Sequence, residues 1–338
     1  MKRILAITIV CLLAMSALTA CGGQGSSPAG SSPDPAAAGT SAQNQATDAT
    51  PAASAGSAPA SAPAPASTPD TTPAPAPASN FDASRPISVV TREEGSGTRD
   101  AVRDLFDIKD ADGKENVTIE AIVSDSTGVM MTNVANNPYA IGYCSLASLN
   151  DSVKALDIDG VAATNANVKD GSYIIQRPFY LATMGEVDGL AKDFIDFILS
   201  NEGQTAATKK CIPADDNAPA YSGSRPSGKI VVGGSSSVSP VMEDLISAYK
   251  VINPNADIEL QVSDSSKGMS DAKSGAYDIG MASREVREAE IADGLVPVFI
   301  AIDGIAVIVN PLNPLGALTV DQVRSIYNGD VEMWNGVG

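Results

Sequence analysis

The sequence predicts an α/β fold with mostly parallel sheets, and three observations support this class. Strand-like and helix-like segments alternate from residue 87 onward. The alternation stops at a Pro-, Ser- and Gly-rich break, PADDNAPAYSGSRPSG (213–228), and restarts after it. The stretch 85–338 is long enough to bury the core of one large or two smaller domains. Such alternation is typical of parallel strands joined by helical crossovers.

Short apolar segments bounded by turn residues predict the strands. They are ISVV (87–90), TIEAIV (118–123), AIGYCSL (140–146), RPFYLAT (177–183), KIVV (229–232), DIELQV (257–262), YDIGMAS (277–283) and DGIAVIVN (303–310).

Cap residues and apolar spacing predict the helices between these strands. They are expected over about 99–106, from Ser126 or Thr127 to about 137, over 189–207 as one long amphipathic helix, from about 240 to the stop at Pro254, near 268–275 and over 319–329.

The amino-terminal region is expected to lie outside the fold. Residues 1–20 have a basic start and an apolar run too short to span a bilayer comfortably, as in a signal peptide. The run closes with LTAC, which resembles the lipobox of a bacterial lipoprotein and implies a diacylglyceryl lipid on Cys21; the alternative is an ordinary signal peptide. Residues 21–84 are nearly all Ala, Pro, Ser, Gly and Thr, so we expect a disordered, partly extended spacer.

Composition excludes several classes of function. The chain has no Cys-x-x-Cys and no Gly-x-x-x-x-Gly-Lys-Ser/Thr phosphate loop. It also has no His, so His-based catalysis and His metal sites are not expected. A formal net charge of -18 argues against a nucleic-acid partner. Cys144 and Cys211 would remain in the folded part, where we expect two buried, unpaired thiols, with a disulfide as the alternative.

Several blocks of the chain resemble the phosphate-binding proteins of ABC transporters. They are ISVVTREEGSGTRDAVRDLF, AIGYCSLASLNDSVKALDIDGV, FIDFILSNEGQ, KIVVGGSSSVSPVMEDLISAY, YDIGMASREVREAE and IAIDGIAVIVNPLNPLGALTVDQVRSIYNGDVEMWNGVG. The resemblance implies a two-lobed type II periplasmic-binding-protein fold. Each lobe would be a mostly parallel sheet flanked by helices, and two crossing strands would form the hinge.

The order of the blocks departs from the family. There the block that resembles GGSSSVSP leads and the block that resembles REEGSGT follows, whereas this chain has the reverse order. We interpret this as a circular permutation, with a misassembled or fragmentary gene as the alternative. One lobe would then combine 85–170 with 307–338, and the other would be 171–306, with old ends joined through the 213–228 break.

The segment TREEGSGTRD (91–100) is the first candidate site. It reads as strand, Gly/Ser/Thr loop and helix, a junction whose exposed N–H groups favour an anion. The resemblance implies that Arg92 contacts phosphate, together with Ser96, Gly97 and Thr98. Glu94 is expected to hold Arg92 by an ion pair.

The opposite wall of the site is expected from three further loops. The resemblance implies hydroxyl donors Ser236 and Ser237 before a helix, and Ser265 and Ser266 in SDSSKG. In GMASRE, many relatives carry an Asp that accepts the proton of monohydrogen phosphate, but this chain has Arg284 there, so Ser283 and Arg284 become donor candidates. Asp303 is the candidate that would take over as proton acceptor.

These observations predict an extracytoplasmic, lipid-anchored protein that captures inorganic phosphate for an ABC permease, with no cofactor, no metal, no catalysis and a monomer as the default state. The alternatives are a surface anion receptor or adhesin that signals, and a phosphoryl-transfer enzyme, which would need a base or metal that the sequence does not show.

Overall fold

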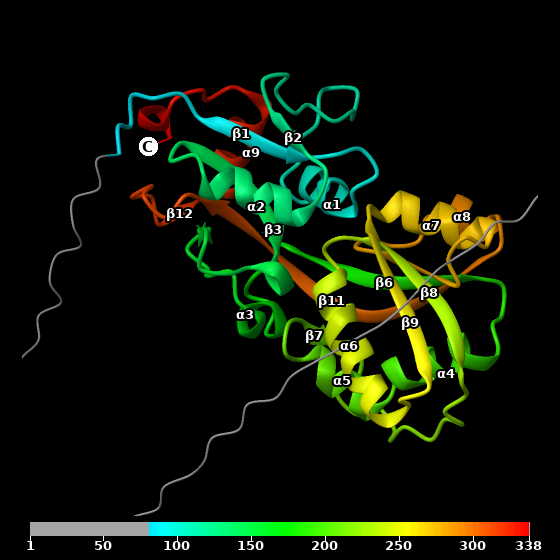
Figure 1. Cartoon of the computed structure of the whole chain (residues 1–338). Helices are drawn as coiled ribbons and strands as arrows, with labels where there is room; N and C mark the ends of the chain where they lie inside the picture. Colours follow the sequence, from blue (N-terminus) through cyan, green and yellow to red (C-terminus); the bar gives the residue numbers. More distant parts are fainter. Residues whose placement is uncertain (1–80, 338) are drawn as a thin grey trace, which may run out of the picture. The chain divides into compact units, whose positions relative to one another are not determined.

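The computed structural model describes residues 81–337, shown in colour in Figure 1. The expected signal peptide, the lipid-attachment residue Cys21 and the spacer as far as residue 80 lie outside the described residues. Within 81–337, no helix is both long and apolar enough to cross a membrane.

Strands of the described region form one ten-stranded sheet and a small two-stranded sheet. The strands are β1 (Ser88–Arg92), β2 (Ile122–Ser124), β3 (Ala140–Ser145), β4 (Lys154–Ala155), β5 (Asp157–Ile158), β6 (Gln176–Met184), β7 (Ile212–Pro213), β8 (Gly228–Ser235), β9 (Ala256–Ser263), β10 (Ile279–Ala282), β11 (Leu295–Val309) and β12 (Ala317–Leu318).

Helices flank the large sheet. They are α1 (Gly97–Leu105), α2 (Thr127–Ala135), α3 (Asn165–Lys169), α4 (Gly189–Ile198), α5 (Asn201–Ala207), α6 (Ser239–Ile252), α7 (Ser265–Ser274), α8 (Glu288–Ala292) and α9 (Val320–Asn328), with short 3-10 turns η1 (Leu146–Ser148) and η2 (Trp334–Gly336).

The large sheet has the order β2-β1-β3-β11-β6-β10-β8-β9. Its two ends are parallel: β1 pairs with β2 and β3, and β8 pairs with β9 and β10. Between them β11 runs antiparallel to β3 through residues 305–309 and to β6 through 295–304. Figure 1 shows β11 passing from one group of elements to the other. This confirms the type II fold, with β6 and β11 as the two hinge strands.

Apolar side chains are buried in two main clusters. The first contains side chains from 89–175 and 305–337, and the second contains side chains from 147–301. We call the parts of the molecule built around them the first lobe and the second lobe. Each lobe buries its own sheet against its own helices, so each has its own core.

The start and the end of the described region lie side by side. Ile87 N–H donates to the Glu332 carbonyl at 2.8 Å, and Pro86 forms an antiparallel bridge with Met333. The Phe81 and Trp334 rings make an edge contact with centroids 5.8 Å apart. The REEGSGT block therefore follows in space directly after the WNGVG segment.

The segment 213–228 is held against the second lobe by one buried carboxylate. Asp193 on α4 accepts hydrogen bonds from the hydroxyls of Tyr221 and Tyr249 and from the backbone N–H groups of Ser224 and Arg225. Asp193 is 5% exposed, so these bonds lie largely out of water. This segment is thus anchored at its middle.

The single long helix expected over 189–207 is wrong, because the chain forms two helices there. Ser200 caps α5 by accepting from Gly203 N–H at 3.3 Å. Gly203 lies so close to the end of α4 that an added Cβ would stand 2.1 Å from the Phe197 carbonyl oxygen. The apolar spacing continues through the break, which is why periodicity alone did not reveal it.

The two cysteines of the folded part are unpaired and buried, as expected: Cys144 lies on β3 and Cys211 precedes β7. Burial raises the pKa of both thiols far above the ordinary value, with the Asp303 carboxylate acting in the same direction. Both are therefore protonated and unreactive at neutral pH.

Candidate anion-binding site

Polar loops from both lobes meet where parallel strands end and helices begin. The first lobe contributes the junctions β1–α1 and β2–α2, and the second lobe contributes β8–α6, β9–α7 and the loop after β10. α/β folds bind ligands at the carboxyl ends of their parallel strands, where the amino-terminal ends of helices present free N–H groups.

Four hydroxyls meet at the centre of the contact between the lobes, and we call them the hydroxyl cluster: Thr98, Thr127, Ser236 and Ser237. Thr98 Oγ1 lies 2.9 Å from Ser237 Oγ, and Thr127 Oγ1 lies 3.0 Å from the same atom. Ser236 Oγ accepts from Thr127 N–H at 3.1 Å. Because these four residues are 1–7% exposed, the cluster is largely dry.

Arg92 is the one buried cation of this cluster. Its Nη2 donates to Ser236 Oγ and its Nη1 to Thr127 Oγ1, both at 3.0 Å, so the guanidinium touches both lobes. Arg92 is 2% exposed. A buried guanidinium with hydroxyls around it is a strong set of donors for an oxyanion.

The ion-pair partner of Arg92 is Glu93 and not Glu94, which corrects the sequence-based expectation. Nε and Nη2 of Arg92 donate to the two Glu93 oxygens at 2.7 and 2.6 Å. Glu94 lies in the turn that Gly95 closes with φ +88°, and its side chain is exposed. The turn begins one residue after the strand, so the first glutamate stays beside the arginine and the second points to water.

The remaining residues of the GSGT loop pack on the second lobe. Ser96 caps α1 by accepting from Arg99 N–H, and it is 2% exposed. Gly97 N–H donates to Ser265 Oγ at 3.3 Å, and the same oxygen accepts from Ser283 N–H at 3.1 Å. Ser266 Oγ donates to the Gly95 carbonyl at 3.2 Å. Ser265, Ser266 and Ser283 thus lie at the interface but beside the hydroxyl cluster.

Arg284 lies further out along the same interface. Its Nη1 and Nη2 donate to the Glu290 carboxylate at 2.9 and 2.8 Å, and Nη2 also reaches Ser266 Oγ at 3.4 Å. Glu290 therefore neutralises Arg284, and no contact joins Arg284 to the hydroxyl cluster within residues 81–337.

Asp303 lies on the hinge strand β11, and its hydrogen-bond partners are residues outside the hydroxyl cluster. One oxygen accepts from Ser145 Oγ at 2.8 Å and Ala147 N–H at 3.2 Å, and the other accepts from Arg177 at 3.1 Å. Burial raises the pKa of Asp303 to about 6, although Arg177 and these hydrogen bonds act in the opposite direction. Both oxygens of Asp303 already accept hydrogen bonds from other residues. These contacts therefore give no support to the expectation that Asp303 accepts the proton of the bound anion.

Sequence reasoning missed three residues here: Glu93, Thr127 and Arg177. Thr127 opens α2 and gives the cluster both its hydroxyl and its N–H. The signal was the segment SDSTGV, a third polar strand-to-helix junction like the two that were singled out. Arg177 is revealed only by the pairing of β6 with β11, which sets it opposite Asp303.

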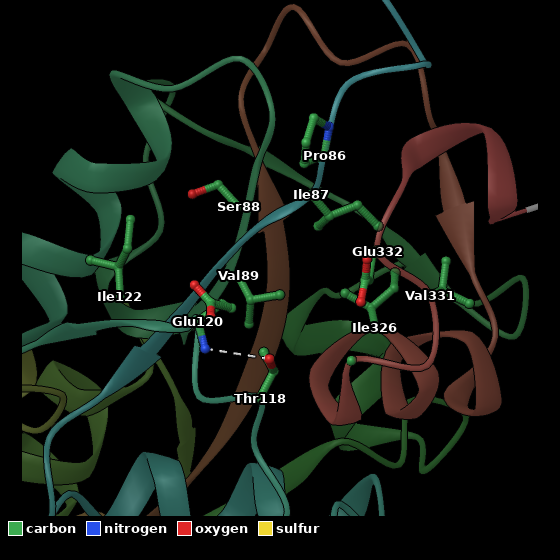
Figure 2. A pocket seen from close by; sticks show the side chains of 11 residues that line it. Pro86, Ile87, Ser88, Val89, Thr118, Glu120, Ile122, Ile326, Val331 and Glu332 are labelled. Atoms are coloured by element: carbon green, nitrogen blue, oxygen red, sulfur yellow. Dashed lines mark hydrogen bonds between the residues drawn. The ribbon is translucent and has the colours of Figure 1, made fainter.

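Two cavities help to locate the site. One of about 740 Å³ lies between the lobes and is lined in part by Thr127 and Ser236 of the hydroxyl cluster. The other, about 370 Å³ and shown in Figure 2, lies at the start of β1 beside Glu120 and Glu332. None of the described residues that line the second cavity is positively charged. An anion is therefore expected between the lobes and not there.

The fold and the converging donors define a substrate-binding protein of the two-lobed type II class. A family model described as the PBP superfamily domain matches residues 76–202 and 219–338. The chain belongs to this superfamily and, within it, to the family of phosphate-binding proteins of ABC transporters.

Individual relatives are similar over most of their length. The phosphate-binding protein PstS 2 of Streptococcus agalactiae serotype V is 46% identical over 262 residues, which is 76% of this chain and 89% of that protein. PstS 2 of Streptococcus pneumoniae serotype 4 is 41% identical, over 76% of this chain and 90% of that protein. A crystal structure of a phosphate-binding protein of a phosphate ABC transporter from Streptococcus pneumoniae TIGR4 is 40% identical with a TM-score of 0.60, covering 75% of this chain and all of that one.

Proposed function

We propose that this protein captures inorganic phosphate between its two lobes and delivers it to an ABC-type importer in the membrane. The observation that carries the proposal is Arg92, a buried guanidinium that touches hydroxyls of both lobes. The relatives named phosphate-binding proteins supply the identity of the anion.

The ligand would replace the direct contacts of the hydroxyl cluster. Each of its four hydroxyls can rotate and donate to an oxyanion, and the N–H groups at the start of α1 and α2 add to them. The cluster brings together donors that lie far apart along the chain. Affinity for the anion then depends on these buried hydrogen-bond donors. The net charge of -18 determines only the long-range electrostatic potential of the protein.

Arg92→Ala tests the proposal by calorimetry with inorganic phosphate. We expect tight binding by the wild-type protein and at least a 100-fold loss in the variant, since a lost charge-assisted pair in a dry site costs about 3 kcal/mol or more. The matched control is Arg324→Ala, whose ion-pair partner Asp321 lies on the same helix α9. Wild-type protein that gives no heat at micromolar phosphate, or a variant that binds normally, would reject the proposal.

We infer that the lobes 85–170 with 307–338 and 171–306 move as units about β6 and β11. The two apolar clusters and the antiparallel hinge strands support this division. We also infer that the block order is natural. Both stretches of the chain match the same family model, and residues 86–87 and 332–333 pair in space where the family order would join them; both observations support this.

The remaining parts of the proposal concern location and use. We propose that the protein acts outside the cytoplasmic membrane, held by a lipid on Cys21, as a monomer that feeds permease subunits and catalyses no reaction. Mass spectrometry of the mature amino-terminal peptide tests the lipid. Phosphate uptake by vesicles that contain the permease separates transport from signalling, and turnover of a phosphate ester by purified protein would favour the enzyme alternative.

A further inference from the structure

The cavity between the lobes is much larger than a phosphate ion needs. Its volume of about 740 Å³ is more than twenty times the share of one water molecule in the liquid, about 30 Å³. It shares Thr127 and Ser236 with the hydroxyl cluster, so one end of the cavity touches the proposed phosphate site. The remaining space extends along α6 and the segment 146–150.

The lining of this cavity is basic in an otherwise acidic protein. Lys209 and Lys210, in the turn after α5, face one acidic lining residue, Glu243. Lys210 lies 3.7 Å from Asp244, whereas Lys209 has no ion-pair partner within residues 81–337. The lining thus holds two positive charges against one negative charge, with Asp244 beside Lys210 outside it, while the whole chain has a net charge of -18.

A helix start adds to this charge. Gly128, at the second position of the nine-residue α2, lines the cavity, is exposed, and has open space where a Cβ would stand. No partner is recorded for its N–H in the described part of the chain. The positive end of α2 thus faces the same space as the two lysines.

The lobes also make close contacts at α1, whose residues do not line the cavity. There Gly97 is packed so tightly that an added Cβ would stand 2.9 Å from the Ser283 carbonyl. Asp100 of the first lobe pairs with Arg287 of the second at 2.7 Å. The cavity, in contrast, borders the hydroxyl cluster through Thr127 and Ser236.

We propose that this cavity is an entry station for the phosphate dianion, in which Lys209 and Lys210 collect the ion before it reaches the hydroxyl cluster. The inference rests on the proposed function. An acidic protein repels a dianion at long range, and a positive cleft with low-dielectric walls offsets this by raising the local concentration of the ion. The effect acts on the rate of association and is screened by salt.

The test compares association and dissociation rates of phosphate for the full chain and for Lys209→Gln/Lys210→Gln. Stopped-flow depletion of free phosphate, read with a fluorescent phosphate sensor, gives both rates. At about 20 mM salt we expect association about 3- to 10-fold slower in the double variant, and near-equal rates at about 500 mM salt. Dissociation should change less than about twofold, since neither lysine contacts the hydroxyl cluster.

The matched control is Lys192→Gln/Lys229→Gln, which changes net charge equally. Both lysines are more than half exposed and pair with Asp196 and Glu259 on the second lobe. An equal loss in the control would assign the effect to global charge and overturn the entry station. So would an unchanged association rate, or a change confined to dissociation. A wild-type protein that binds no phosphate in calorimetry would overturn the proposed function together with this inference.

Discussion

At the scale of single residues, the site depends on which glutamate follows the strand. Arg92 ends β1, and Glu93 is the last residue that the strand direction holds beside it before the Gly95 turn. Arg92 is followed by two glutamates, Glu93 and Glu94. Their spacing from Arg92 in the sequence does not indicate which carboxylate forms the ion pair. Only the position of the turn decided the ion pair.

Glu93→Gln should lower the free energy of unfolding without phosphate by about 1–3 kcal/mol. The variant leaves the buried guanidinium of Arg92 without its ion-pair partner. Breaking a fully buried ion pair costs about 3–5 kcal/mol, and the cost is smaller here because the Glu93 side chain is 18% exposed. Urea unfolding measures the change. Glu94→Gln is the control and should stay within about 0.5 kcal/mol. Equal losses in the two variants would contradict the assignment of the ion pair.

The hinge carboxylate Asp303 makes stability depend on pH in an unusual direction. Burial raises its pKa from 3.8 to about 6, so between these values the folded protein holds a proton that the unfolded chain has lost. The stabilisation from this group is therefore complete below about pH 4 and is lost as the pH rises through about 6.

Comparison of the wild-type protein with Asp303→Asn isolates this effect. The difference in unfolding free energy between them should shrink by on the order of 2–3 kcal/mol as the pH rises from about 4 to about 7, and then stay constant. Urea unfolding at a series of pH values provides the measurement. Curves that run parallel across this range would show that Asp303 is ionised throughout.

At the scale of elements, the sequence predicted most strands and helices near their observed positions. The helix at 189–207 was one exception, because Ser200 and Gly203 interrupt it without disturbing the apolar period. The strand predicted over 118–123 was another, because only β2 (Ile122–Ser124) is extended there. The strand at 303–310 was also only part of β11, which begins at Leu295. Its first half has partly exposed residues, so it lacks the apolar run by which the second half was found.

Gly203→Ala should destabilise the junction of α4 and α5. A methyl group there would meet the Phe197 carbonyl at 2.1 Å, and backbone cannot move away as a side chain could. We expect a loss of about 2–3 kcal/mol in urea unfolding. Gly316→Ala is the control, since open space surrounds that position, and it should stay within about 0.5 kcal/mol. Similar values for both would mean that the two helices can separate freely.

At the scale of the whole molecule, side chains from both lobes hold the closed arrangement. Besides the hydroxyl cluster, Asp100 on α1 bridges to Arg287 beside α8 at 2.7 Å. Figure 1 shows these two elements on facing parts of the lobes. Because closure traps the ligand, any contact between lobes contributes to affinity as well as to closure.

Arg287→Gln should therefore weaken phosphate binding modestly. Arg287 is about half exposed, so its pair with Asp100 is worth about 0.2–1 kcal/mol, which is up to about fivefold in affinity. A double-mutant cycle with Asp100→Asn, followed by calorimetry, measures the coupling. Lys267→Gln is the control, because its partner Asp271 lies on the same helix α7. A coupling of zero would mean that this contact has no part in closure.

The sequence by itself determined the α/β class, the order of most elements and the loops that carry the donors. These features depend on local patterns: apolar period, cap residues and glycine turns. The tertiary structure alone decided which donors meet. Thr127 joins Arg92 and Ser236 because strands far apart in the chain bring their ends together. Asp303 pairs with Arg177 because β6 sets that residue opposite it on β11. Such contacts are set by strand pairing and lobe closure, and no local segment of sequence encodes either.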